Sequence, residues 1–338
     1  MPADPVPVTR VVSGIQPTGN LHLGNLLGAI LRWVDMQDQA PCLFFLADLH
    51  SLSDHVDPAV RRANVREMAA ALIAAGIDPA RSVLFAQSAV PAHAELCWLL
   101  NGTARMGWLS RMTQWKDKSG KNKEGASVAL FDYPVLQAAD ILLYNASHVP
   151  VGEDQKQHIE LTRDIAIKFN TDYGTDLFVA PEPFIGAGTA ARVMSLRDGS
   201  AKMSKSDPSD MSRINLVDSD DEIAAKVRKA RTDPDPLPDD PAALEGRPEA
   251  RNLVGIMAAV TGRTEADICR DHAGQGFGQF KPVLADALVA LLGPIRGRLE
   301  QLRSDPAALD RQLADGAARA AALGAPILEG AYRAVGLR

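Results

Sequence analysis

Short apolar runs alternate with helical patterns through the first half of this chain, and this alternation restricts the folds open to it. Residues 42–48 and 82–87 are apolar and short enough to form buried strands. Between them, Asp57 and Pro58 supply an N-cap and a first helical turn, and the helical spacing that follows stops at Gly76. Strand, helix and strand in this order predict an α/β fold with a parallel sheet covered by helices.

The same order returns farther along the chain. Residues 147–152 predict another strand, and residues 154–169 have the spacing of the helix that would follow it. After about Arg197, glycine, serine and charged residues replace the apolar runs, and residues 218–302 then have helical patterns around a loop rich in proline and aspartate. We therefore expect a second, helical domain, followed by an alanine-rich helical segment that packs back on the first domain.

Composition limits the class of protein. The chain has 338 residues, of which 46% are hydrophobic and 23% charged. It has neither an apolar run of about 20 residues nor the pattern of a signal peptide, so we expect a globular, cytoplasmic protein with no membrane partner. The cysteines lie far apart, at Cys42, Cys97 and Cys269, which predicts no zinc site, iron–sulfur site or disulfide.

Positive charge is concentrated in two stretches, although the net charge of −6 argues against indiscriminate binding to nucleic acid. Arginines and lysines gather between residues 105 and 123, beside Trp108 and Trp115. The second group consists of Lys226, Arg228, Lys229 and Arg231. Each stretch is either a solvated face or a surface that neutralises nucleic-acid phosphates, and the charge pattern alone leaves both open.

Residues 13–25, with the sequence SGIQPTGNLHLGN, connect a predicted strand to a helical pattern. The helix after such a turn presents free backbone N–H groups and the positive end of its dipole to a ligand. Gly24 leaves space beside the backbone, and His22 and Asn25 can both point to one ligand group, with Gln16 nearby. A tight turn whose histidine only caps the helix explains the same residues.

A second motif, KMSKS at residues 202–206, lies where the two predicted domains meet, in a stretch rich in glycine, serine and charge. A mobile loop with Lys202 and Lys205 can close over a polyphosphate and stabilise negative charge as it develops. The alternative is a solvated, charged linker.

One carboxylate has unusual surroundings. Asp140 lies in the otherwise apolar segment PVLQAADILLY, where burying an unpaired charge costs several kcal/mol, so it requires a partner. A structural ion pair would supply one. A bound indole would supply another, because its N–H is a donor without acceptor character and a carboxylate selects it over the ring of phenylalanine.

Taken together, PTGNLHLGN and KMSKS resemble the paired ATP motifs of class I aminoacyl-tRNA synthetases, with Asn25 where the first motif usually ends in histidine. The segment FDYPVLQAADILLYNASHVPVGEDQKQHIELTRDIA resembles the tryptophan-specific members of bacteria and mitochondria, and so do SGIQPTG, RMTQWKDKS and GFGQFKPVLADAL. The resemblance extends over nearly the whole chain.

The resemblance implies activation of L-tryptophan with ATP, release of pyrophosphate, and transfer of tryptophan to the 3′ end of its tRNA. It implies a Rossmann-like catalytic domain over residues 1–197, with a connective helical insertion around residues 88–145. Residues 198–302 would form an all-helical anticodon-binding domain, and residues 303–338 would pack back on the catalytic domain. Because family members pair through the catalytic domain, we expect a homodimer.

The resemblance also assigns residues to ligands. Those expected to bind ATP are Gln16, Pro17, Thr18, His22, Gly24, Asn25, Gly152, Glu153, Asp154, Val193, Lys202, Met203, Ser204, Lys205 and Ser206. Those expected to act on the phosphates in catalysis are Lys118, Lys202 and Lys205, with Mg²⁺ held through phosphate oxygens rather than by a protein cage. Those expected around tryptophan are Ser13, His50, Tyr133, Gln137, Asp140 and Gln155, with Tyr133 and Gln155 near the substrate ammonium.

The substrate has an alternative. Tyr133, Gln137 and Asp140 at their spacing also resemble the substrate-binding helix of tyrosine-specific synthetases. Val12 and Gln137 stand where many tryptophan-specific members have an aromatic residue and a methionine. The C-terminal part, however, lacks the separate extension common in bacterial tyrosine-specific enzymes.

Other classes of protein also remain open. A small-molecule nucleotidyltransferase uses a similar turn, and a synthetase-like module would bind tRNA without charging it. Single residues have structural interpretations as well: His50 can be a packed core histidine, and Glu153 or Asp154 can cap the helix that follows.

Overall fold

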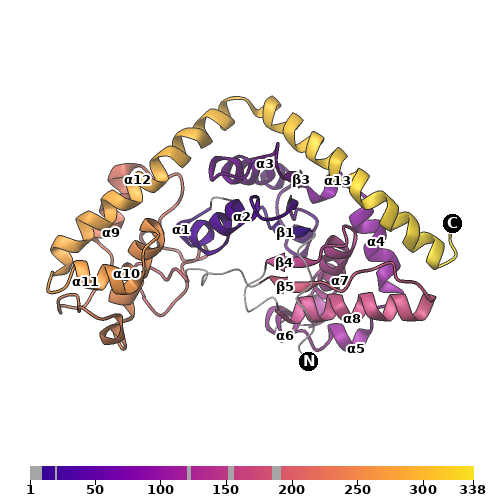
Figure 1. The fold of residues 1–338 in the computed structure, drawn as a ribbon, viewed down its shortest axis with the longest axis horizontal. Helices are drawn as coiled ribbons and strands as arrows, with labels where there is room; N and C mark the ends of the chain where they lie inside the picture. The colour runs from indigo at the N-terminus through magenta and orange to yellow at the C-terminus, as the bar shows by residue number, and fades with distance from the viewer. Residues whose placement is uncertain (1–9, 20, 120–122, 151–155, 185–191) are drawn as a thin grey trace.

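The computed structural model describes residues 10–338 except residues 20, 120–122, 151–155 and 185–191. Five parallel strands form one sheet in the order β3-β2-β1-β4-β5 (Figure 1). They are β1 (Val11–Ile15), β2 (Cys42–Leu46), β3 (Val83–Ala86), β4 (His148–Pro150) and β5 (Glu182–Phe184). The chain builds from β1 outward to β3 and then returns to add β4 and β5 on the other side, which creates a switch point between β1 and β4. The predicted α/β fold with a parallel sheet is confirmed.

Helices make up most of the remaining described chain, and none of them is both long and apolar enough to cross a bilayer. In the first part they are α1 (Leu23–Asn25), α2 (Leu31–Met36), α3 (Pro58–Ala74), α4 (Ala92–Asn101), α5 (Met106–Leu109), α6 (Thr113–Ser119), α7 (Val128–Leu142) and α8 (Lys156–Tyr173). In the second part they are α9 (Asp220–Arg228), α10 (Pro248–Thr261), α11 (Glu265–Asp271), α12 (Phe277–Ser304) and α13 (Pro306–Ala334).

Helices cover both faces of the sheet because successive strand residues point to opposite sides. Phe44 of β2 stacks on Trp33 of α2, with ring centroids 5.2 Å apart, in a core that also contains Met68 of α3. The adjacent Phe45 points the other way, into a second core that contains Val135 of α7. This explains why the predicted strands are apolar on both faces rather than alternating.

Local capping agrees with the sequence at α3 and differs after the opening turn. The Asp57 carboxylate accepts hydrogen bonds from the backbone N–H groups of Ala59 and Val60, so it caps α3 as predicted. After the turn the regular helical spacing predicts an α-helix, but residues 26–30 form a π-helical turn, in which the Leu31 N–H donates to the Leu26 carbonyl. Such wider turns are frequent at functional sites.

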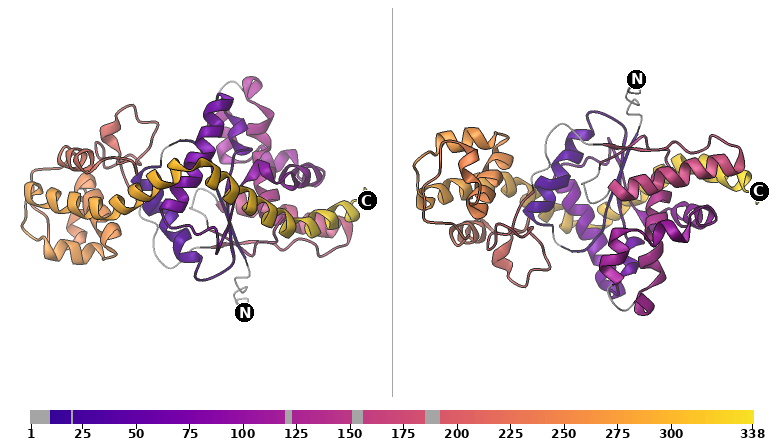
Figure 2. Two further views of the ribbon diagram at one scale, coloured as in Figure 1. Left: turned by 90° about the horizontal axis from the view of Figure 1, so that it is seen from above. Right: turned by 90° about the horizontal axis from the view of Figure 1, so that it is seen from below.

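The two longest helices, α12 and α13, meet at Asp305 and form an arch above the sheet (Figures 1 and 2). α12 packs on α9 and α3, and α13 packs on β3 and α4. A Cβ at Gly316 of α13 would lie 1.8 Å from the Leu84 carbonyl oxygen of β3, so only glycine allows this approach. The outer edge of β3 is thereby covered.

Two ion pairs tie α3 to both sides of this junction. Arg66 pairs with Asp310 of α13, with both nitrogen–oxygen distances at 2.8 Å, and the adjacent Glu67 pairs with Arg303 of α12. Helix α3 therefore contacts α12 and α13 on both sides of the bend, in addition to the direct packing of α13 on β3.

Candidate active site

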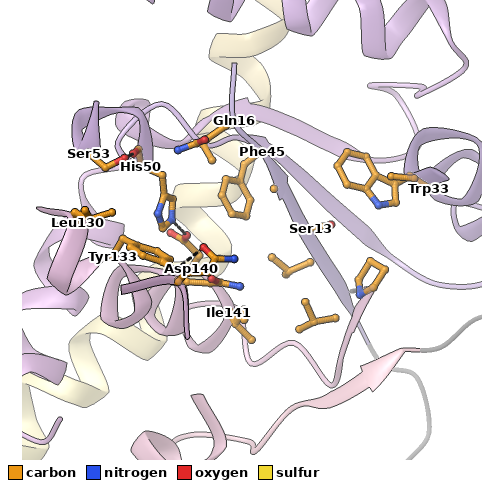
Figure 3. A pocket seen from close by; sticks show the side chains of 18 residues that line it. Ser13, Gln16, Trp33, Phe45, His50, Ser53, Leu130, Tyr133, Asp140 and Ile141 are labelled. Carbon is orange, nitrogen blue, oxygen red and sulfur yellow. Dashed lines mark hydrogen bonds and ion pairs between the residues drawn. The ribbon is translucent and has the colours of Figure 1, made fainter. Parts of the chain in front are cut away.

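A cavity of about 360 Å³ lies beside β1, β2 and β4, at the switch point of the sheet. Ser13 and the backbone of Gly14 line it from β1, and Phe45 lines it from β2. In Figure 3, His50, Tyr133 and Asp140 gather at one end of the cavity, and Trp33 lies at the other. Val12, Gln16 and Gln137 are also lining residues.

Asp140 lies on α7 at this end of the cavity and is 1% exposed. Its Oδ2 accepts a hydrogen bond from His50 Nε2 at 2.8 Å. Its Oδ1 accepts from Gln87 Nε2 at 2.6 Å and from His93 Nδ1 at 2.7 Å. Because an ionised carboxylate only accepts, both of these imidazole nitrogens carry a proton.

The charge of Asp140 follows from these contacts. Burial alone would raise the pKa of the carboxyl, but the hydrogen bonds donated by His50 and His93 help to outweigh burial, and the pKa of Asp140 lies below its ordinary value. The carboxylate therefore has the structural partners that its apolar surroundings require, and it still faces the cavity. The structural interpretation of Asp140 is thus confirmed, and recognition of an indole stays a prediction.

A second polar group forms the adjacent wall. The Tyr133 hydroxyl donates to Gln114 Oε1 at 2.7 Å and lies 2.8 Å from His158 Nε2. Because its single proton is used on Gln114, Tyr133 accepts from His158. Burial raises the pKa of Tyr133 to about 12, so the phenol is neutral at physiological pH.

The opening turn holds a buried, neutral imidazole. His22 is 6% exposed, and its Nδ1 has no hydrogen-bond partner among the described residues. Burial, and then the positive charges of Lys205, Arg213 and Lys202, lower the pKa of His22 to about 4. A histidine beside so many cations stays uncharged near pH 7.

Asn25 has a structural role in the turn. Its side-chain oxygen accepts the backbone N–H of His22 at 3.1 Å, so this oxygen stabilises the turn itself. Gly24 packs closely on the ring of His22: a Cβ there would lie 3.0 Å from the His22 ring and 3.7 Å from Met203, so a larger residue would have to displace the ring. The turn is thus stabilised by Asn25 and needs a small residue at position 24.

The KMSKS loop folds over this turn. Met203 is buried, and its N–H donates to the Val193 carbonyl at 3.1 Å. The Lys205 ammonium donates to both the carbonyl and the hydroxyl of Thr18. Lys202 is exposed, and the hydroxyls of Ser204 and Ser206 lie 2.8 Å apart. The structure therefore brings together two motifs whose contacting residues, Thr18 and Lys205, are 187 positions apart in the chain.

Some expected site residues cannot be placed. Gly152, Glu153, Asp154 and Gln155 lie outside the described residues. Lys118 lies on α6, but its side chain is outside what the structure describes. Pro17 is buried in the opening turn and Gln16 lines the cavity, so this turn borders both the cavity and the KMSKS loop.

Comparison with known proteins decides the family. The model of "tRNA synthetases class I (W and Y)" matches residues 7–293. This chain belongs to that family. The synthetase is 57% identical to the tryptophan–tRNA ligase of Caulobacter vibrioides, over 98% of each chain. It is 54% identical to the tryptophan–tRNA ligase of Brucella melitensis, over 93% of each chain.

Solved structures agree with this assignment. The synthetase superimposes on the tryptophanyl-tRNA synthetase of Campylobacter jejuni complexed with ADP and tryptophan, with a TM-score of 0.81, 35% identity, and coverage of 97% of this chain and 100% of that one. For the Mycoplasma pneumoniae tryptophanyl-tRNA synthetase the TM-score is 0.86 and the identity 31%, with 98% of each chain covered. The Archaeoglobus fulgidus tyrosyl-tRNA synthetase, at 21% identity and a TM-score of 0.67, shares the fold.

The prediction that Lys226 belongs to a basic surface stretch of the synthetase is wrong. Lys226 is 4% exposed, and its ammonium lies 2.6 Å from carboxylate oxygens of both Asp210 and Asp218. It is on the inner face of α9 and unavailable to nucleic acid. Of the same stretch, Arg228, Lys229 and Arg231 are exposed, as are Arg105, Arg111 and Lys116 of the first stretch.

Sequence reasoning missed several residues of the site. Gln87 and His93, which hold Asp140, follow β3, and Gln114 faces Tyr133 from α6. Gln87 is the first residue after β3, and polar residues at the carboxyl ends of parallel strands are a general signal of ligand sites. No comparable signal marks His93 or Gln114.

Proposed function

We propose that this synthetase activates L-tryptophan with ATP and transfers the tryptophanyl group to the 3′ end of tRNA. The observation that carries the choice of substrate is the Asp140 carboxylate, which is buried, ionised and placed at the end of the cavity. The names of the relatives at 57% and 54% identity support the same substrate.

Recognition of the indole follows from the unequal use of the two Asp140 oxygens. Oδ1 accepts two hydrogen bonds, whereas the described contacts of Oδ2 comprise one, from His50. A carboxylate oxygen accepts two, so Oδ2 can also accept the indole N–H. Phe45 and Val12 provide apolar walls for the ring. Phenylalanine would leave the charge beside a C–H group, which costs binding energy.

The polar end of the amino acid needs acceptors for its ammonium. Tyr133 and Gln155 are our proposed contacts, and the Gln114 oxygen, which takes one hydrogen bond from Tyr133, has a second acceptor position. Ser13, His50 and Gln137 complete the proposed pocket around the side chain.

The opening turn and the KMSKS loop fit a nucleotide. Gly24 has no side chain that would press on the His22 ring, and the buried Nδ1 of His22 can pair with the ligand because no described residue uses it. The proposed ATP contacts are Gln16, Pro17, Thr18, His22, Gly24, Asn25, Gly152, Glu153, Asp154, Val193, Lys202, Met203, Ser204, Lys205 and Ser206. Mg²⁺ would be held by phosphate oxygens and would neutralise part of their charge.

The chemistry needs positioning more than acid–base catalysis. The tryptophan carboxylate is already a nucleophile at neutral pH, and it attacks the α-phosphorus in line as pyrophosphate leaves. Lys118, Lys202 and Lys205 stabilise the charge that develops on the departing oxygens. The ribose hydroxyl at the tRNA end then attacks the adenylate carbonyl, and AMP leaves.

We further propose that the enzyme is a cytoplasmic homodimer that holds one tRNA across both subunits. Residues 1–197 of one subunit would hold the 3′ end and residues 198–302 of the other the anticodon, while residues 303–338 would pack back on the catalytic part. The exposed cations Arg228, Lys229 and Arg231 support a phosphate contact in the helical part.

The test is amino-acid-dependent exchange of pyrophosphate into ATP, run with each of the standard amino acids. Tryptophan alone is expected to drive robust exchange. Preferential exchange with tyrosine, whose hydroxyl is also a donor to Asp140, would overturn the substrate and leave the family intact. Absence of exchange with every amino acid, combined with tRNA binding, would favour the non-catalytic module.

A further inference from the structure

Behind Asp140 lies a buried row of polar groups that the proposed reaction does not use. His93 Nδ1 is 2.7 Å from Asp140 Oδ1, and His93 Nε2 is 2.8 Å from the Tyr144 hydroxyl. His93 and Tyr144 are both 0% exposed, and neither is among the described residues that line the cavity. They support the carboxylate from the side opposite the substrate.

The protons in this row are determined by the end groups. Asp140 is an acceptor, so His93 Nδ1 carries a proton, and a neutral imidazole then has an acceptor at Nε2. The Tyr144 hydroxyl donates to it, and burial together with the Asp140 charge raises the pKa of that phenol, which keeps the proton in place. Tyr144 thereby selects the one tautomer of neutral His93 that can donate to Asp140.

Aromatic rings pack against His93 and Tyr144 and restrict their movement. The Phe85 ring lies 5.8 Å from the His93 ring and 6.1 Å from that of Tyr144, and the Phe45 ring lies 5.8 Å from His93. These rings leave His93 little freedom to turn. Phe45 also lines the cavity, so the same ring contacts the supporting histidine and borders the substrate site.

We propose that His93 and Tyr144 are positioning residues that fix the Asp140 carboxylate for recognition of a side chain with an N–H donor. By occupying Oδ1, His93 and Gln87 leave Oδ2 as the oxygen that faces the ligand. This inference rests on the proposed function, because it assumes that Asp140 accepts the indole N–H.

The experiment compares L-tryptophan with 3-(benzothien-3-yl)-L-alanine, which has sulfur in place of the indole N–H, in pyrophosphate exchange. The discrimination ratio is kcat/KM for tryptophan divided by kcat/KM for the analogue. Three variants test the row: His93→Leu removes both hydrogen bonds, His93→Asn keeps a donor near the position of Nδ1, and Tyr144→Phe removes only the phenol oxygen. Phe85→Leu is the matched control, since it loosens the packing without removing a hydrogen bond.

We expect the ratio to fall about tenfold in His93→Leu, and about threefold in Tyr144→Phe, because a hydrogen bond to a charged group is lost or weakened. His93→Asn is expected to recover most of the ratio, and Phe85→Leu to keep it. The loss is expected in KM for tryptophan rather than in kcat, since the indole contact is present in both ground and transition states. The KM for the analogue is expected to stay unchanged.

Two results would overturn the inference: a wild-type ratio in both His93→Leu and Tyr144→Phe, or an equal loss in Phe85→Leu, which would make the row simple packing. If His93→Leu melts below the assay temperature, Tyr144→Phe decides. Failure of the proposed function is separate, because Asp140→Asn would then also leave the ratio unchanged. A ¹⁵N spectrum adds a readout without substrate: His93 is expected to show a protonated Nδ1 and an accepting Nε2, and the Nε2 signal is expected to shift in Tyr144→Phe.

Discussion

The Lys205 ammonium donates hydrogen bonds to the carbonyl and the hydroxyl of Thr18, a residue 187 positions earlier in the chain. This contact joins the KMSKS loop to the opening turn. Thr18 offers only neutral oxygens, and partial desolvation lowers the pKa of the Lys205 ammonium. A phosphate would bind this ammonium more strongly than the neutral oxygens of Thr18 do. Lys205 can therefore leave Thr18 and bind a phosphate at the proposed nucleotide site.

Lys205→Ala is expected to slow adenylate formation far more than it weakens tryptophan binding, because the charge matters most as pyrophosphate leaves. Loss of a donor of this kind raises the barrier by about 2.7–4 kcal/mol, or roughly 100- to 1000-fold in rate. Single-turnover quench kinetics would measure the rate, and fluorescence titration the tryptophan affinity. Thr18→Val is the matched control, as it removes only the hydroxyl and is expected to have a much smaller effect. A large loss of tryptophan affinity at an unchanged rate would assign Lys205 to ground-state binding.

The lowered pKa of His22 is expected to make the free energy of unfolding depend on pH in the acid range. Its pKa in the folded chain is about 4, against 6.5 for the free side chain, so the unfolded chain binds the proton more tightly. The stabilising contribution is complete above about pH 6.5 and is lost as the pH falls toward 4. His22→Gln is therefore expected to lose less stability than the wild type over this interval.

Urea unfolding at a series of pH values would measure the difference between the two free energies of unfolding. His55→Gln, at an exposed histidine, is the matched control for the substitution itself. Parallel curves for wild type and His22→Gln would show that His22 is not held neutral by its surroundings.

The sequence predicts the fold well, because apolar runs and helix caps are local signals. It also identifies Asp140, since one charge in an apolar helix is conspicuous. It does not predict how Asp140 is held. Gln87 and His93 are 53 and 47 residues away along the chain, and only the packing of α4 against α7 brings His93 to the carboxylate. Tertiary contacts of this kind leave no spacing rule in one sequence.

Lys226 is a different case, because its burial was visible in the helical spacing. Ile223 is buried three residues before Lys226, on the same face of α9, and Ala230, just beyond the helix, is buried as well. A count of charges in residues 226–231 does not reveal which of these side chains lie on the buried face of α9. The Lys226 ammonium pairs with Asp210 and Asp218, which lie in the segment before α9.

Substitution of Lys226 is therefore expected to reduce stability rather than tRNA affinity. Lys226→Met would leave Asp218, itself 5% exposed, without its cation, and breaking such a buried pair costs about 3–5 kcal/mol. Lys229→Ala, on the exposed side, is expected to leave the free energy of unfolding nearly unchanged. Chemical denaturation and filter-binding of tRNA would measure the two effects. A wild-type melting curve for Lys226→Met would show that the ion pair contributes little.

The proposed binding of one tRNA across two subunits follows from the separation of the two sites. Helices α9, α10 and α11 lie along α12 at one end of the molecule, away from the strands (Figures 1 and 2). Arg228, Lys229 and Arg231 are at the end of α9 and just after it, whereas the cavity is lined by residues of the strands and α7. Each cation can neutralise a phosphate, and the affinity should fall steeply with salt. If the two sites that serve one tRNA belong to different subunits, defects placed in different subunits will complement each other.

Mixing two inactive variants tests this. One carries Arg228→Ala, Lys229→Ala and Arg231→Ala, which leaves the buried Lys226 in place, and the other carries Lys205→Ala. After subunit exchange, hybrid dimers are expected to recover tRNA charging, because an intact catalytic site then faces an intact helical part on its partner. A second mixture supplies the control: a chain with all four substitutions, in excess over wild type, should suppress the wild-type activity. In each hybrid dimer, one tRNA would meet a defective catalytic site and the other a defective helical part. Neither complementation nor suppression, despite demonstrated subunit exchange, would mean that each subunit serves its own tRNA.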